Sequence, residues 1–196
     1  MTRSAAVRVM TLFGALVLLT GCQHSENKAV DRDPLPTSAE PPYVCGHIPA
    51  RAVELMTGAR DPLVQGSFDL SAAGGLGAGS CAVYQRGGER LKLLQIQLTP
   101  GGFRGAVEEQ LADGASPLPE LVPGAVGYYF APADGEDNEA YALLVRGKAE
   151  IDIALEIGVE GRDNAADVLA LMKLIAPRLI TDASAPSAGP SAPGKG

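Results

Sequence analysis

One histidine and one run of carboxylates are the side chains of this sequence that could carry out chemistry. A Ser-His-Asp hydrolase needs a base beside a nucleophile and an orienting acid, and His47 is the histidine in the central part of the chain. The stretch Gly77-Ala78-Gly79-Ser80 lacks the final glycine of the G-x-S-x-G nucleophile motif. We therefore expect no catalytic residues, keep a hydrolytic enzyme as the last alternative, and interpret His47 as a residue at the start of a helix.

The run of carboxylates, residues 134–139, could bind a hard cation such as Ca²⁺, which prefers oxygen ligands. Glycine is its second residue, and no glutamate follows at the distance that an EF-hand requires. The residues favour a solvated hairpin turn, and the alternative is a weak metal site formed by Asp134, Glu136, Asp137 and Glu139. No cofactor is predicted, because no Lys-Ser or Lys-Thr pair follows the glycines near residue 75 to form a phosphate-binding loop.

The charge balance excludes one class of partner. Among 196 residues, 23 are acidic and 16 are basic, so the formal net charge is −7. Proteins that bind nucleic acid carry a basic patch, and we expect no nucleic-acid partner here. The 24 glycines and 15 prolines make up about a fifth of the chain, which indicates that part of its length lies outside a packed domain.

The N-terminal residues have the layout of a secretory signal peptide. Arg3 and Arg8 lead into an apolar run of about 11 residues, whereas a helix that spans a bilayer needs roughly 20. The segment Leu19-Thr20-Gly21-Cys22 resembles the lipobox of bacterial lipoproteins. This resemblance implies that residues 1–21 are removed, and that acyl chains on Cys22 anchor the protein at the extracytoplasmic face of the cell membrane. An exported protein with a chance cysteine at this position is the alternative.

Two further segments have compositions that do not favour packing. Residues 22–42 are polar and contain four prolines, which is typical of a disordered tether behind the lipidated cysteine. Residues 183–196 are almost wholly Ala, Ser, Pro and Gly, so we expect a disordered tail. Residues 43–182 remain, about 140 residues, a common size for a single globular domain. Loss of Arg3 and Arg8 leaves 14 basic residues against 23 acidic ones, a mature net charge of −9.

The other two cysteines, Cys45 and Cys81, are predicted to form a disulfide. An exported chain with two cysteines left after lipidation is most simply interpreted in this way. The bond would close a loop of about 36 residues, worth roughly 3.5 to 4 kcal/mol in the loop-entropy model. The alternative, a reactive or metal-binding thiol, has only His47 as a further ligand nearby.

Hydrophobic periodicity predicts an alternation of strands and helices. Glycine pairs or Gly-Lys predict tight hairpin turns at residues 87–88 and 147–148, and the glycine-rich residues 71–80 predict an exposed loop. The last helix is expected to begin at Asn164 as its cap and to bend or end late at Pro177. Strands are expected at residues 63–70, 81–86, 89–99, 126–130, 140–146 and 149–160, and helices at residues 48–57, 103–114 and from 164 onward.

These elements predict an α+β fold. Strands with one apolar face and helices with one apolar stripe must bury them together, so we expect an antiparallel sheet of five or six strands with helices packed on one face, a two-layer sandwich. The order strand, Arg-Gly turn, strand, helix occurs twice, at residues 81–111 and 141–172. Duplication of a hairpin-plus-helix unit and a chance repeat both remain open.

Three consecutive aromatic residues lie in the strand at residues 126–130. Alternation sends Tyr128 and Phe130 to one face and Tyr129 to the other. We expect the pair to lie in the core and Tyr129 to be exposed. Core packing and contact with a ligand or partner both stay open for this strand.

The cysteine environments carry a second resemblance. Cys45-Gly46-His47-Ile48-Pro49 places a cysteine just before a short helix, and Gly79-Ser80-Cys81-Ala82-Val83-Tyr84 places another at the opening of a strand after glycines. Together with the lipobox and the proline-rich tether, these segments resemble small cell-envelope lipoproteins of actinobacteria that are grouped as domains of unknown function. The resemblance implies a location in the cell envelope and a fold, and it implies no activity.

We therefore expect a membrane-anchored lipoprotein with a non-catalytic binding or sensor-like domain. Its partner would be a small apolar ligand or an envelope protein, held by the sheet face or by the glycine-rich loop. The alternative is a structural or accessory envelope protein without a ligand pocket. The candidate contact residues are Tyr129, Gly74, Gly75, Gly77 and Gly79.

Overall fold

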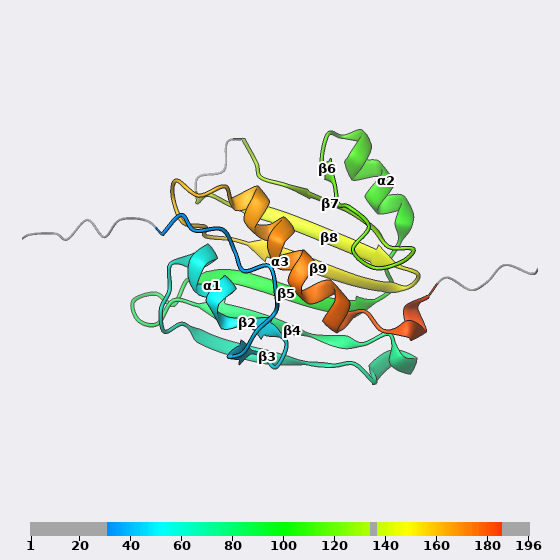
Figure 1. Ribbon diagram of the computed structural model, residues 1–196, viewed down its shortest axis with the longest axis horizontal. Coiled ribbons are helices and arrows are strands. Elements are labelled where there is room, and N and C mark those ends of the chain that lie inside the picture. The colour runs from blue at the N-terminus through cyan, green and yellow to red at the C-terminus, as the bar shows by residue number, and fades with distance from the viewer. Residues whose placement is uncertain (1–30, 134–136, 186–196) are drawn as a thin grey trace, which may run out of the picture.

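The computed structural model describes residues 31–133 and 137–185, which form an α+β domain around one seven-stranded antiparallel sheet. The strand order is β3-β4-β5-β9-β8-β7-β6 (Figure 1). A separate two-stranded sheet joins β1 (Tyr43–Val44) to β2 (Ile48–Pro49). The strands of the large sheet are β3 (Leu63–Asp69), β4 (Ala78–Tyr84), β5 (Lys92–Pro100), β6 (Ser116–Pro117), β7 (Val126–Phe130), β8 (Ala140–Arg146) and β9 (Ala149–Leu155).

Three α-helices and two short 3₁₀ turns complete the domain. The helices are α1 (Ala50–Thr57), α2 (Arg104–Ala112) and α3 (Asn164–Leu179), and the turns are η1 (Ala72–Gly75) and η2 (Asp182–Ser184). Figure 1 shows α1 and α3 in front of the sheet, with α3 crossing β8 and β9. None of the helices within the described residues is long and apolar enough to cross a bilayer.

The core lies between α1, α3 and the centre of the sheet. Residues paired across antiparallel strands share a face, and Ile96 of β5 stands opposite Ile153 of β9. Both side chains are fully buried, as is Met172 of α3 in the same cluster. The largest fully buried side chains of the domain are those of Ile48, Met56, Leu94, Ile96, Leu98, Leu144, Ile151, Ile153, Leu155, Leu171, Met172 and Ile175.

Helix α2 packs elsewhere, against β7 and β8. Its buried residue is Val107, which lies outside the core cluster, and so does the buried Val145 of β8. Because successive side chains of a strand point to opposite faces, Val145 faces away from its core neighbour Leu144. We call the face that carries Val145 the outer face of the sheet.

The α+β class and the antiparallel sheet are confirmed, and the predicted number of strands is wrong. All six expected strands are present, and the seventh is β6, where Ser116 and Pro117 pair with Tyr129 and Tyr128. A strand of two residues, one of which is proline, is too short to show a pattern that predicts it. The turn at residues 147–148 is tight, since Arg146 pairs with Ala149. The other hairpin has a longer connection over residues 85–91, after a register shift at Val83 and Tyr84.

The end of the expected tether is packed on the domain. Leu35 is buried in the core cluster, and the backbone carbonyls of Asp31 and Asp33 accept hydrogen bonds from Arg162. The carbonyl of Pro42 accepts a hydrogen bond from the Ala50 amide. Residues 31–42 therefore differ from the expected disordered chain, because the buried Leu35, the contacts of Arg162 and an ion pair between Arg51 and Asp31 hold them. We call residues 31–35 the strap.

The start of the expected tail is packed as well. The guanidinium of Arg146 donates to the carbonyls of Pro123 and Thr181 and to the hydroxyl of Ser184, which is 1% exposed. The Thr181 hydroxyl donates to the carbonyl of Gly75 and so joins η2 to η1. Residues 183–185 thus belong to the domain, and residues 186–196 lie outside the described part of the chain.

Candidate functional site

The predicted disulfide between Cys45 and Cys81 is present, with the two Cα atoms 5.8 Å apart. His47 stands two residues after Cys45, between β1 and β2. Its ring packs edge-to-face with that of Phe68, with 6.0 Å between the ring centroids and an angle of 80° between the planes. Burial, followed by the nearby charge of Arg178, lowers the pKa of His47. Because the Arg178 guanidinium also donates to the His47 carbonyl, these contacts give His47 a structural place at the beginning of the domain.

The glycine-rich segment splits into a 3₁₀ turn and the start of β4. Gly74 and Gly75 belong to η1, and Gly79 is inside β4 opposite Phe68. A Cβ atom at Gly79 would lie 2.2 Å from the Ser67 carbonyl oxygen, and one at Gly77 would lie 2.5 Å from the Leu98 side chain. Close approach of backbone and side chain therefore explains these two glycines without a ligand. This segment differs from the expected exposed loop, and its role in ligand contact stays a prediction.

The acidic run is only partly described, and Asp134 and Glu136 lie outside the described residues. The Asp137 carbonyl accepts a hydrogen bond from the Gly158 amide at 2.9 Å, and the Glu139 carboxylate accepts one from the Tyr141 hydroxyl at 2.6 Å. Among residues 31–133 and 137–185, no group of three or more His, Cys, Asp or Glu side chains is placed to hold a metal ion. Cys22, the predicted lipidation site, also lies outside the described part.

The expected facing of the three aromatic residues of β7 is wrong. Tyr129 is opposite Ala142, which is 1% exposed, and it packs against the core cluster. Tyr128 and Phe130 therefore point to the outer face, together with their partners Leu143 and Tyr141. The strand is short and apolar on both sides, so alternation alone leaves open which set is buried. Tyr129 remains half-buried, and its contact with a ligand remains a prediction.

The outer face carries a row of three stacked rings. The ring centroids of Tyr128 and Phe130 are 6.1 Å apart with an angle of 23° between the planes, and those of Phe130 and Tyr141 are 5.2 Å apart with 29°. All three side chains are half-buried. We call Tyr128, Phe130 and Tyr141 the aromatic row. Offset near-parallel rings at such separations stabilise one another, and they present a continuous apolar surface beside α2.

Carboxylates lie on one side of this row, in β9 and just before β8. Burial, then the charge of Glu150, raises the pKa of Asp152 on β9. Burial, then Asp152 and Glu150, raises the pKa of Tyr128. The hydrogen bond to Glu139 raises the pKa of Tyr141 to about 12, with burial and the charges of Glu139, Glu156 and Asp152 as further causes. Negatively charged side chains therefore lie close to Tyr128 and Tyr141.

Lys92, at one end of the outer face, already has a hydrogen-bond partner and an ion-pair partner. Lys92 donates to the Gln95 side chain at 2.6 Å and forms an ion pair with Glu156 at 2.7 Å. Glu139, Glu150 and Asp152 form no ion pair with a described lysine or arginine. We call these three residues with Glu156 the carboxylate set.

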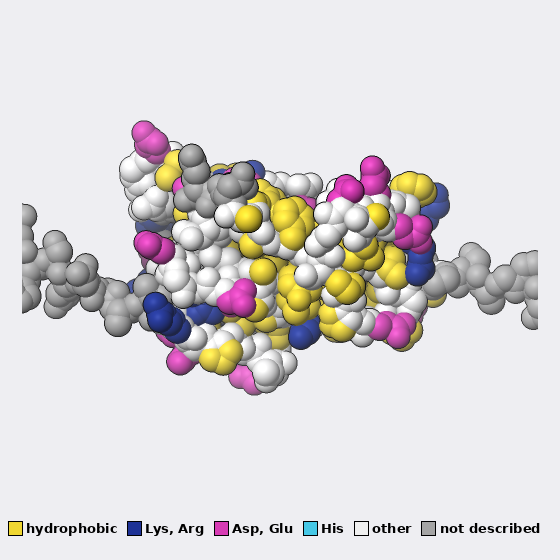
Figure 2. Space-filling view, turned by 90° about the horizontal axis from the view of Figure 1, so that it is seen from above, with side chains coloured by type: hydrophobic (Ala, Val, Ile, Leu, Met, Phe, Trp, Pro, Cys, Tyr) yellow, Lys and Arg dark blue, Asp and Glu magenta, His cyan; other side chains and the backbone are white. Residues whose placement is uncertain are grey.

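A cavity of about 280 Å³ adjoins the aromatic row at the C-terminal end of α2. Phe130 forms part of its wall, and Gln110 and Asp113 contribute polar groups. Figure 2 shows hydrophobic side chains gathered along this edge of the molecule, over β7 and beside α2, with acidic side chains on the α2 side. Its volume lies near the lower limit of small-molecule sites, so the cavity would suit a small ligand. The full lining is Gln110, Asp113, Gly114, Ala115, Phe130 and Ala131.

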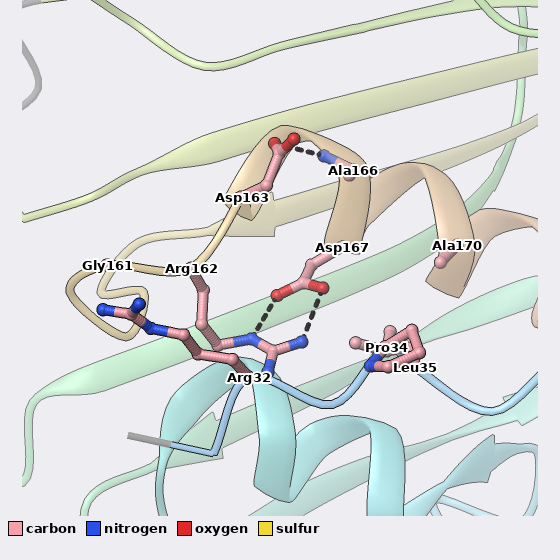
Figure 3. A pocket seen from close by; sticks show the side chains of 9 residues that line it. All are labelled: Arg32, Pro34, Leu35, Gly161, Arg162, Asp163, Ala166, Asp167 and Ala170. Carbon is pink, nitrogen blue, oxygen red and sulfur yellow. Dashed lines mark hydrogen bonds and ion pairs between the residues drawn. The ribbon is translucent and has the colours of Figure 1, made fainter. Parts of the chain in front are cut away.

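A second cavity, of about 320 Å³, lies between the strap and the N-terminal end of α3 (Figure 3). Arg162 and Asp167 form a bidentate ion pair there, with nitrogen to oxygen distances of 2.7 and 2.8 Å. Their side chains are 4% and 9% exposed. Asp163 caps the helix by accepting a hydrogen bond from the Ala166 amide, a role that the sequence had predicted for Asn164. Arg162, which is paired with Asp167 of α3, also donates to the carbonyls of Asp31 and Asp33, so this ion pair holds the strap to α3.

Comparisons with known proteins supply no further guide to these sites: no family model, no curated protein and no solved structure matches the chain. The aromatic row and the carboxylate set were missed by sequence reasoning. Glu150 and Asp152 alternate with apolar residues in the sequence, a pattern that indicates one face of the strand but not which strands lie beside it. The signal that could have joined them to Tyr128 is the pairing of β9 with β8 and of β8 with β7, which no local pattern gives.

Proposed function

We propose that this chain is a lipid-anchored cell-envelope protein whose domain binds a small ligand, without catalysis, at the aromatic row and the adjoining cavity. The observation that carries the proposal is the row itself. Three half-buried rings on the outer face, next to a cavity walled by Phe130, form an apolar surface that the core does not use. Such surfaces mark ligand or partner sites more often than chance positions do.

The proposed anchor rests on the lipobox and on its resemblance to actinobacterial envelope lipoproteins. Cys22 stands nine residues before Asp31, and an extended chain covers at most about 3.5 Å per residue. Acyl chains on Cys22 would therefore keep Asp31 within about 30 Å of the membrane surface. Because Arg162 holds the strap, we propose that the end of the domain bearing the N-terminus of α3 faces the membrane.

We also propose that the domain arose by duplication of a hairpin-plus-helix unit and that it has two layers. Hairpins β4–β5 and β8–β9 lie side by side in the sheet, and each is followed by a helix, which supports duplication of a hairpin-plus-helix unit. A two-layer arrangement is proposed for α1 and α3 and is supported by their buried residues, which share one cluster with the sheet. Helix α2, with Val107 outside that cluster, is the exception to helices on one face.

An accessory envelope protein without a ligand pocket is the second candidate. It is favoured by the core between α3 and the sheet, where large side chains such as Leu144, Ile151 and Leu171 are fully buried and fill the space. A ligand of this domain would have to bind at the surface cavities. The two candidates therefore differ in whether the aromatic row contacts a small molecule or another protein.

Native mass spectrometry of the protein extracted from its membrane in mild detergent tests both parts of the proposal. We expect a mass that includes acyl chains on Cys22, one disulfide and a retained small molecule, which the Phe130→Leu variant should lose. The matched control is Phe103→Leu, which removes a ring that is 69% exposed at the opposite end of α2. An unmodified Cys22 would overturn the anchor. Equal retention by both variants would overturn the site.

A further inference from the structure

The chemistry of the outer face bears on the class of ligand, an inference that rests on the proposed function. Aromatic rings carry negative potential on their faces and attract cations, most strongly where water is partly excluded. Tyr128, Phe130 and Tyr141 supply three half-buried rings in one row. A neutral apolar ligand would contact the same rings, so the charges around the rings decide whether a cation or a neutral ligand is favoured.

Those charges are negative on the β9 side of the row, at Tyr141 and at the cavity, whereas Ser116 and Pro117 of β6, on the other side of β7, are uncharged. Asp152 and Glu150 act on Tyr128 from β9, and Glu139 binds the hydroxyl of Tyr141 at 2.6 Å. On the α2 side, Asp113 is exposed at the cavity and follows the last turn of the helix, whose dipole places partial negative charge at that end. A cation at the cavity would be favoured by these groups and an anion would be repelled.

The raised pKa values of Tyr128 and Asp152 point the same way. Both are raised first by burial and then by neighbouring carboxylates. Lys92 compensates Glu156 and also donates to Gln95, whereas Glu150 and Asp152 form no ion pair with a described lysine or arginine.

We propose that the cavity at the C-terminal end of α2 binds a small organic ammonium ion, with its charged head against Phe130 and its charge balanced by Asp113 in the cavity wall and by Glu139, which binds the hydroxyl of Tyr141 next to Phe130. The volume of about 280 Å³ suits a compact head group. The half-burial of the rings favours an alkylated ammonium over a bare metal ion, because its methyl groups can replace water at the apolar surface.

The test compares a cation with its uncharged isostere on the full mature chain in dodecyl maltoside. Choline and 3,3-dimethylbutan-1-ol have nearly the same shape and differ by one positive charge. Chemical shifts of ¹³C-labelled Tyr and Phe rings would report binding of each probe. We expect choline to shift the signals of the aromatic row in a saturable way and to bind about five- to tenfold more tightly than the alcohol.

Variants locate the effect. Phe130→Leu keeps an apolar side chain but removes the ring, and Asp113→Asn removes the charge in the cavity wall with little change in shape. Each should weaken choline binding about threefold or more, while Phe103→Leu and Asp61→Asn, which change an exposed ring and an exposed carboxylate away from the cavity, should leave it unchanged.

The remaining outcomes separate this inference from the proposed function. Equal binding of choline and the alcohol, or tighter binding of the neutral sugar N-acetylglucosamine at the same rings, would overturn the cation assignment and leave a binding site in place. Failure of choline to shift any ring signal would also overturn the cation assignment. The proposed function would then be decided by the retained small molecule in native mass spectrometry.

Discussion

Removing one partner of the buried ion pair between Arg162 and Asp167 should destabilise this domain far more than breaking an exposed ion pair. The side chains of Arg162 and Asp167 are 4% and 9% exposed, and two parallel hydrogen bonds join them at 2.7 and 2.8 Å. The same guanidinium donates to the carbonyls of Asp31 and Asp33. Replacing Asp167 by asparagine removes the negative charge and leaves the guanidinium buried with only neutral acceptors.

Removal of one partner of a buried pair costs about 3 to 5 kcal/mol, because the other charge stays buried and unpaired. The two carbonyls of the strap still satisfy part of the guanidinium, so we expect Asp167→Asn to lower the free energy of unfolding by about 3 kcal/mol. With a urea dependence near 2 kcal/mol per molar, the unfolding midpoint should fall by about 1.5 M. Circular dichroism of the full mature chain, with its disulfide intact, measures this shift.

Two further variants make the measurement decisive. Glu108→Gln breaks the exposed pair with Arg104, whose side chains are 69% and 63% exposed, and should cost less than about 0.5 kcal/mol. The double variant Arg162→Met with Asp167→Leu removes both charges and should recover most of the stability lost by Asp167→Asn. If Asp167→Asn cost no more than Glu108→Gln, the burial argument for this pair would be refuted.

The other predictions concern the disulfide and the outer face. In denatured but unreduced protein, a thiol reagent should label neither Cys45 nor Cys81, and reduction should lower the free energy of unfolding by roughly 3.5 to 4 kcal/mol, as measured by urea titration; full labelling without reductant would contradict the bond. Burial and Glu150 raise the folded-state pKa of Asp152 above its usual 3.8, so its charge opposes folding at pH 7 and this cost disappears as the pH falls below about 4. Asp152→Asn should therefore raise the urea midpoint at pH 7 and lose that advantage near pH 4; an equal advantage at both pH values would show another cause. Because its hydrogen bond to Glu139 raises the pKa of Tyr141 to about 12, one tyrosine should ionise well above the others in an absorbance titration, and Glu139→Gln should bring it back toward 10; an unchanged titration in that variant would assign the shift elsewhere.

Much of the scaffold could be predicted from local patterns. The alternation of Ile151 and Ile153 with Asp152 identifies β9 and its buried face, and the three cysteines indicate one disulfide once Cys22 is set aside. The strap could not be predicted, because its polar, proline-bearing composition is that of a linker. Its attachment depends on Leu35, on Arg51, which pairs with Asp31, and on Arg162, which stands more than a hundred residues later in the chain.

The aromatic row shows why the candidate site escaped the same reasoning. Tyr128, Tyr129 and Phe130 are all apolar enough for either face, and the facing of β7 is set by its register with β8, where Ala142 stands opposite Tyr129. A slip of one residue would exchange the two faces and bury Tyr128 and Phe130 in place of Tyr129. The small Ala142 leaves room for one ring over the core, whereas the outer face holds two rings from β7 and a third, Tyr141, from β8. Packing volume in the core therefore decides which aromatic side chains remain for the outer face, and with them the position of the proposed ligand site.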